Sequence, residues 1–243
     1  MRLRLTIAYD GRQYAGWQSQ PAGNAVQDFI EKAFREIAGT RVAVHASGRT
    51  DAGVHALGQC AHVEVFGSME AGDWQSALNA SLPPTIRIVG ARSVAPDFHA
   101  RFSAKGKVYR YLVRNTPVLP PHEFGRVWHV PHALDVGALR RTAEAFTGRH
   151  DFAAFSANRS KAARETVRTI RKIALSLRTG LIALTFEGDG FLYRMVRMLA
   201  AAMVRVAQQR EDLDTLRARL AKGAPKWNHV APAEGLYLVR VLY

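Results

Sequence analysis

One short segment carries the residue types of an active site. Residues 45–56 read HASGRTDAGVHA, and Asp51 is the only acidic residue between Glu36 and Glu64. Arg49 stands two positions earlier, so both side chains fall on the same side if the segment is extended. A neighbouring guanidinium favours the ionised carboxylate, and an ionised, positioned Asp acts as a nucleophile or general base. The alternative is a turn Asp that bonds its own backbone.

A second pattern suits the binding of a nucleobase. Lys107, Tyr109 and Tyr111 alternate along an expected strand, so they share one face. Aromatic rings beside a cation stack on bases and attract phosphates. An ordinary cross-strand aromatic pair is the alternative interpretation.

Two further stretches are strongly basic. Residues 156–172 contain one acid, Glu165, against six basic residues: Arg159, Lys161, Arg164, Arg168, Arg171 and Lys172. We expect this segment to bind phosphates, and a solvated loop is the alternative. Arg194, Arg197 and Arg205 lie on an otherwise apolar helical segment. Because an unpaired buried charge is costly, they require an acidic partner or a phosphate.

The overall charge also favours a polyanionic partner. The chain of 243 residues has 34 Lys and Arg against 20 Asp and Glu, a net charge of +14. Residues 1–104 hold 10 against 9, or +1, and residues 105–243 hold 24 against 11, or +13. A basic surface attracts nucleic acid because neutralised phosphates release counterions. The alternative is charge that merely keeps the protein soluble.

The composition excludes several other classes of protein. A single cysteine excludes a disulfide framework and a Cys-rich zinc site. No HExxH, phosphate-binding GxxxxGK[ST] or cofactor fingerprint is present, so we expect neither a metal nor a cofactor. No run approaches the roughly 18 apolar residues of a membrane helix, and the N-terminus is unlike a signal peptide. We therefore expect a cytoplasmic protein without a membrane partner.

Periodicity predicts the elements that must position these residues. In the first half, residues 2–9 alternate as a half-buried strand does, and a helix is expected from the N-cap Asn24 to the stop at Gly39. Strands over 41–46, 57–66 and 86–93 and a helix over 74–82 complete this half. The second half predicts strands over 107–115, 170–177, 181–187 and 236–243, with helices after Asp135, over 191–208 and around 213–220.

Each half thus has the order β-α-β-β-α-β, with one extra helix in the second. This order is that of the split βαβ, or ferredoxin-like, arrangement. We predict an α+β protein of two such units, residues 1–104 and 105–243, with joined antiparallel sheets and a central RNA-binding cleft.

Several short blocks follow one another along the chain, and their joint order is specific although each block alone is weak. The principal blocks lie at residues 9–20, 26–27, 48–56, 98–104, 109–111, 150–152, 168–170, 195–197 and 231–238. They cover nearly the whole chain, and together they resemble the bacterial tRNA pseudouridine synthase A family.

The resemblance implies an activity and assigns roles. The implied reaction converts uridine to pseudouridine at positions 38, 39 and 40 in the tRNA anticodon stem-loop, without a cofactor, in a homodimer. By matched motif, Asp51 takes the place of the catalytic aspartate, and Arg49 and Arg197 those of basic residues around it. Tyr109 takes the place of the tyrosine that stacks on the target base. We add Lys161, Arg164 and Arg168 as expected RNA contacts.

The chemistry agrees with the residues but leaves alternatives open. The reaction is an isomerisation that needs neither electrons nor ATP, and the target base must first be flipped out of the helix. Asp51 would start it by attacking the uracil ring, by attacking the sugar C1′ or by taking a sugar proton. A non-catalytic RNA-binding protein or chaperone would also explain the charge and the aromatics. A nucleosidase or glycosylase would use an acidic residue too, but it would release the base.

Overall fold

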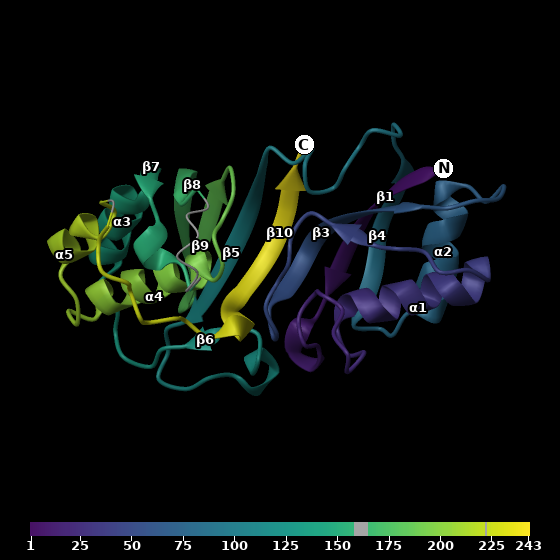
Figure 1. Ribbon diagram of the computed structural model, residues 1–243. Coiled ribbons are helices and arrows are strands. Elements are labelled where there is room, and N and C mark those ends of the chain that lie inside the picture. The colour runs from purple at the N-terminus through teal and green to yellow at the C-terminus, as the bar shows by residue number, and fades with distance from the viewer. Residues whose placement is uncertain (158–164, 222) are drawn as a thin grey trace. The chain divides into compact units, whose positions relative to one another are not determined.

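The computed structural model describes residues 1–157, 165–221 and 223–243. The chain forms two compact units, coloured by residue number in Figure 1. The first unit is Met1–Lys105 with Tyr237–Tyr243, and the second is Gly106–Leu236. Within the described ranges, no helix is long and apolar enough to cross a membrane.

The first unit contains four antiparallel strands in the ferredoxin-like order β4-β1-β3-β2, with a fifth strand added in parallel. Its strands are β1 (Arg2–Tyr9), β2 (His45–Ala46), β3 (His55–Glu64), β4 (Ile86–Ser93) and β10 (Leu236–Leu242). β1 lies between β4 and β3, and β2 pairs with β3. Leu3, Leu5 and Ile7 are wholly buried on one face of β1, as the alternation predicts. β10 pairs with β3 in parallel, with Tyr237 opposite His55.

Two helices supply the rest of this core. They are α1 (Val26–Ala38) and α2 (Ala71–Ser81), and the rings of Phe34 and Trp74 meet between them at 5.4 Å. α1 begins after Ala25 rather than after the predicted cap Asn24, and the Asp28 carboxylate accepts a hydrogen bond from the Ala25 N–H. It ends as predicted at Gly39, whose φ of +67° is a conformation that favours glycine.

The second unit has its own antiparallel strands in the order β5-β9-β8-β7. These are β5 (Gly106–Arg114), β7 (Gly148–Asp151), β8 (Val167–Arg178) and β9 (Leu181–Gly188), and the short β6 (Trp128–His129) pairs with β5 in parallel. The helices are α3 (Val136–Phe146), α4 (Met195–Ala207) and α5 (Leu213–Ala218). Ten of the 13 residues of α4 are buried, so α4 is the core helix of this unit.

The α+β class is confirmed, and three elements differ from their prediction. The expected strand over 41–46 pairs with β3 only at His45 and Ala46. The expected helix over 191–208 begins at Met195, because Arg194 adopts a left-handed conformation with φ of 60°. The last strand was expected in the second half, but Tyr237–Tyr243 lies in the first unit because β10 pairs with β3. The joined sheets and the central cleft stay predictions.

Candidate active site

Asp51 lies in the loop that connects β2 to β3. The N–H of Val54 donates to the Asp51 carbonyl at 3.2 Å, and Gly53 has a φ of +78°, so residues 51–54 form a tight turn. The side chain of Asp51 is half-buried and that of Arg49 is exposed. The loop therefore carries a half-buried carboxylate and an exposed guanidinium two positions apart in the sequence, and their location on one side stays a prediction.

Two glycines that precede the loop in the sequence pack against its backbone. At Gly16, where φ is +91°, a Cβ would lie 2.5 Å from the Thr50 carbonyl oxygen. At Gly11, a Cβ would lie 2.0 Å from the Val54 carbonyl oxygen. The N–H of Trp17 donates to the Thr50 carbonyl at 3.1 Å. Backbone from residues 11–17 therefore packs directly on both ends of the turn at Asp51, which only glycine permits.

Buried polar side chains fix the same loop from beneath. The hydroxyls of Tyr9 and Thr50 are 2.8 Å apart. Gln59 Nε2 donates to the Gly48 carbonyl at 2.9 Å, and Ser47 Oγ donates to Gln59 Oε1 at 2.8 Å. Burial raises the pKa of Tyr9 far above its usual value, so its hydroxyl stays protonated. These bonds hold the backbone on both sides of Arg49, and such support keeps a catalytic group in place.

A second group of side chains flanks the end of the loop, and our sequence reasoning missed it. Buried His55 stacks on the ring of Tyr237, with centroids 4.5 Å apart, and its Nδ1 accepts from the Gly11 N–H at 3.2 Å. Asp10 Oδ1 lies 3.4 Å from the same nitrogen. Burial opposes ionisation of Asp10, but hydrogen bonds from Arg12 outweigh it and lower the pKa of Asp10. The only signal was that Asp10 and His55 fall within the blocks at 9–20 and 48–56.

Tyr109 lies on β5 in the second unit, opposite Phe186 of β9. Its ring is 8% exposed and meets Phe191 edge-on, with centroids 5.2 Å apart. Tyr111 has a different role, because it is fully buried and its hydroxyl donates to the Pro232 carbonyl at 2.7 Å. Both tyrosines of the predicted face are thus buried, and the stacking of Tyr109 on a base stays a prediction.

The two arginines within α4 donate hydrogen bonds to backbone carbonyls. Arg197 lies in the first turn, and its Nε donates to the Ala231 carbonyl at 2.8 Å. Arg205 Nη2 donates to the Arg210 carbonyl at 3.3 Å, while its buried Nε has no hydrogen-bond partner within the described residues. Arg194 lies over the ring of Tyr193 at 5.0 Å. Carbonyl oxygens thus supply part of the pairing that the sequence led us to expect from acids or phosphates.

The predicted basic segment is described only in part. Lys161 and Arg164 lie outside the described residues. Arg168 lies near the start of β8, and its Nη1 donates to the carbonyls of Glu165 and Val167 at 3.0 and 2.6 Å. Arg168 therefore stabilises its own turn of backbone, and its contact with RNA stays a prediction.

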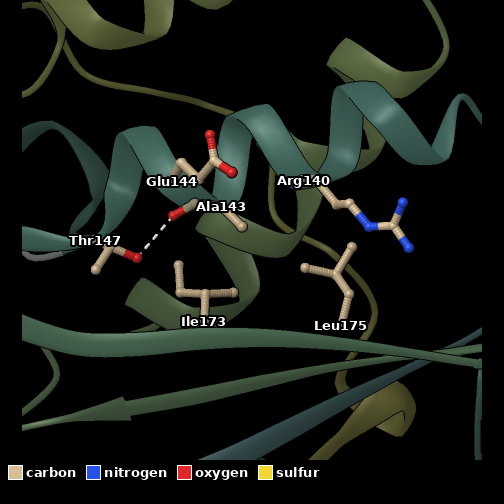
Figure 2. A pocket seen from close by; sticks show the side chains of 6 residues that line it. All are labelled: Arg140, Ala143, Glu144, Thr147, Ile173 and Leu175. Carbon is tan, nitrogen blue, oxygen red and sulfur yellow. Dashed lines mark hydrogen bonds between the residues drawn. The ribbon is translucent and has the colours of Figure 1, made fainter.

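The hollow drawn in Figure 2 contains none of the predicted site residues. It has a volume of about 410 Å³ and lies between α3 and β8 of the second unit. Its lining is Arg140, Ala143, Glu144, Thr147, Ile173 and Leu175. The side chains of Arg140, Glu144 and Thr147 lie on and just after α3, facing the aliphatic side chains of β8, and the Thr147 hydroxyl donates to the Ala143 carbonyl at 2.9 Å. Within the described ranges there is also no cluster of three His, Cys, Asp or Glu side chains that would hold a metal ion.

Comparisons with known proteins identify the family of this chain. A family model described as tRNA pseudouridine synthase matches residues 5–103 and 142–243. A protein of Akkermansia muciniphila is 45% identical, with 100% of this chain and 95% of the relative covered. Relatives from Chromobacterium violaceum and Acetivibrio thermocellus are 42% and 39% identical, covering 100% and 99% of this chain and 93% and 99% of their own. All three relatives are named tRNA pseudouridine synthase A. The chain therefore belongs to the tRNA pseudouridine synthase family, a family of isomerases.

Proposed function

We propose that this enzyme converts uridine to pseudouridine at positions 38, 39 and 40 of the tRNA anticodon stem-loop, with Asp51 as its catalytic residue. It acts as a cytoplasmic homodimer without a cofactor. The observation that carries the proposal is the Asp51 turn, which Gly11, Gly16 and Tyr9 hold in one conformation. The shared name of the relatives supports tRNA as the substrate.

The reaction makes a particular demand on Asp51. It breaks the bond between uracil N1 and the sugar C1′, turns the base, and joins C5 to C1′ while C5 loses a proton and N1 gains one. The atoms and electrons balance within the nucleotide, so one positioned carboxylate can serve as nucleophile or base. A loop fixed at both ends keeps that carboxylate near the reacting carbon, which raises the effective concentration of the reacting groups.

The other candidate residues support binding. Tyr109 stacks on the flipped base and keeps it from diffusing away while it is detached. Arg49 binds phosphate or stabilises the Asp51 carboxylate, and Arg197 binds phosphate. Lys161, Arg164 and Arg168 contact phosphates outside the reacting nucleotide. The second unit, with 22 Lys and Arg against 11 Asp and Glu, supplies the long-range attraction for tRNA.

Replacing Asp51 by Asn tests this proposal. Asp51→Asn keeps the size of the side chain and removes the charge, so the single-turnover rate should fall by at least about 1,000-fold. The dissociation constant for tRNA should stay within about threefold of wild type, because binding rests on other residues. Asp73→Asn, in the first turn of α2, is the matched control and should leave both quantities unchanged.

Each other outcome points to a specific error. A rate within about tenfold of wild type in Asp51→Asn would remove Asp51 from the chemistry. Free uracil in solution would indicate a glycosylase. Binding without any change to uridine in the wild-type protein would indicate an RNA-binding protein. Sedimentation that shows only monomers at micromolar concentration would contradict the homodimer.

A further inference from the structure

A row of side-chain amides connects Arg49 to helix α1. Arg49 Nε donates to Gln18 Oε1 at 3.1 Å, and Gln18 Nε2 donates to Gln27 Oε1 at 2.9 Å. Gln27 Nε2 in turn donates to Glu31 Oε1 at 2.8 Å. All four residues belong to the first unit, and the row ends two residues before Asp51.

The two ends of this row permit only one orientation of each amide. An ionised Glu31 accepts but does not donate, and its Oε1 also accepts from the Val44 N–H at 3.1 Å. Gln27 must therefore turn its NH₂ toward Glu31. The N–H of Ser19, which can only donate, requires the same orientation, because it binds Gln27 Oε1 at 3.1 Å.

The orientation of Gln27 determines that of Gln18. The oxygen of Gln27 faces Gln18, so Gln18 must present its NH₂ there and its oxygen to Arg49. A guanidinium has donors only, and a reversed Gln18 amide would place NH₂ against it. Gln18 holds the guanidinium at Nε, and within the described ranges the two Nη nitrogens of Arg49 make no hydrogen bond, so their donors are available to a substrate.

We propose that Gln18 is a positioning residue for Arg49, and that Glu31 and Gln27 set the direction in which Gln18 acts. This inference rests on the proposed function, in which Arg49 acts beside Asp51. The row keeps an exposed guanidinium in one rotamer, with its two Nη groups directed at the substrate. Such preorganisation removes the need to order a long side chain during the reaction.

A merely structural role for Gln18 is separable from this one. The backbone of the loop is held by Gly11, Gly16, Tyr9 and Gln59. None of these contacts passes through the side chain of Gln18. Removing the Gln18 amide therefore leaves the loop in place and releases only Arg49.

A double-mutant cycle tests the proposal. The single-turnover rate at saturating tRNA is measured for Gln18→Met, Arg49→Met and the double variant. We expect about a 10-fold loss in Gln18→Met and about a 100-fold loss in Arg49→Met. The double variant should lie within about twofold of Arg49→Met, because Gln18 acts through Arg49. Glu31→Gln should cost about threefold in the wild-type background and nothing in Arg49→Met.

The controls separate positioning from packing. Gln20→Met is matched in type and location, since Gln20 Nε2 binds the Ala15 carbonyl at 3.0 Å and takes no part in the row. It should keep the wild-type rate, and Gln18→Met should keep the wild-type melting temperature and tRNA dissociation constant.

Three results would overturn the proposal. One is an equal loss of single-turnover rate from Gln18→Met in the wild-type and Arg49→Met backgrounds, which would mean that Gln18 acts through packing and not through Arg49. Another is a wild-type rate in Gln18→Met, and the third is a wild-type rate in Arg49→Met. Any of these would leave the proposed function standing if Asp51→Asn is inactive. An active Asp51→Asn would remove the proposed function whatever the cycle gives.

Discussion

The two units differ in net charge and in the way their candidate site residues are held. The first unit, with 12 Lys and Arg against 9 Asp and Glu, has a net charge of +3 and carries Asp51 on a tightly packed turn. The second unit has a net charge of +11 and carries Tyr109 and Arg197 on a strand and a helix. Under the proposed function, the first unit would act through short-range contacts around Asp51, and the second through the summed attraction of its positive charges for tRNA.

Because of this contrast, we expect amino-acid substitutions to have different effects in the two units. A turn held by backbone contacts at Gly11 and Gly16 loses its geometry when one atom is added. A basic surface loses only its share of the attraction when one charge is removed. Substitutions in the first unit should therefore act on the rate and on stability, and substitutions in the second mainly on affinity.

The largest effect is expected at Gly16. Gly16→Ala places a Cβ 2.5 Å from the Thr50 oxygen at a φ of +91°, so we expect destabilisation by about 3 kcal/mol and loss of most activity. Gly23→Ala is the control, because its φ is +64° and a Cβ there meets no atom within 4 Å. It should cost about 1 kcal/mol, the backbone penalty alone. The free energy of unfolding of each variant is measured by urea denaturation. Equal values for Gly16→Ala and Gly23→Ala would show that the packing of Gly16 on Thr50 does not hold the loop.

The next largest effect is expected at Tyr109 of the second unit, on the affinity for tRNA. Tyr109→Phe keeps the ring and should retain most tRNA affinity, whereas Tyr109→Ala should lose roughly 1–3 kcal/mol of binding free energy. Binding is measured with a tRNA analogue whose target base is already flipped out. Unchanged affinity in Tyr109→Ala would assign Tyr109 to packing against Phe186 and Phe191 instead.

A pH effect tests whether histidines add charge to the first unit. Burial, together with the nearby His99, His45 and Arg2, lowers the pKa of His62 to about 4, against about 6.5 in an unfolded chain. Between these values the unfolded chain binds a proton that the folded chain does not. Stability is therefore complete above pH 6.5 and falls as the pH drops toward 4.

The measurement is chemical denaturation at pH 7.5 and pH 5.0. From pH 7.5 to pH 5.0, the free energy of unfolding of the wild-type protein should fall by up to about 2 kcal/mol more than that of His62→Asn, because Asn does not titrate. Asn keeps an acceptor for the Ala100 N–H, which binds His62 Nδ1 at 3.2 Å. The same pH dependence in both proteins would mean that folding does not lower the pKa of His62.

The smallest effect concerns single charges of the second unit. Lys161→Ala and Arg164→Ala should each flatten the plot of log affinity against log salt by about one unit, with little change in the rate on bound tRNA. Lys32→Ala, on α1 of the first unit, should leave the slope unchanged. A lower single-turnover rate with intact affinity would instead place these two residues in the active site.

Local patterns in the sequence predicted most elements because their causes are local. Alternation in residues 2–9 gave β1, and Asp135 caps α3 by accepting from the Ala138 N–H. In the expected strand over 41–46, Val42 and Val44 are buried although they form no strand. The Val44 N–H bonds to the Glu31 carboxylate instead of a neighbouring strand. Alternation thus reports which side chains are buried and not where the backbone bonds.

The remaining features depend on residues that are distant in the sequence. Nothing near Gly16 indicates that the Thr50 carbonyl will lie against it, and nothing near Gln18 indicates Arg49 as its partner. The parallel pairing of Tyr237 with His55 joins residues at opposite ends of the chain. The residue types of the candidate site were therefore predictable, whereas the contacts that hold them were not.

We propose that the chain makes pseudouridine in the anticodon stem-loop through Asp51. Incubation of the purified protein with a uridine-labelled tRNA transcript, followed by mapping of pseudouridine along the product, tests this proposal. We predict pseudouridine at positions 38, 39 or 40, no release of free uracil, and no product with Asp51→Asn under the same conditions. Pseudouridine only outside the anticodon stem-loop, or unchanged product formation by Asp51→Asn, would contradict the claim.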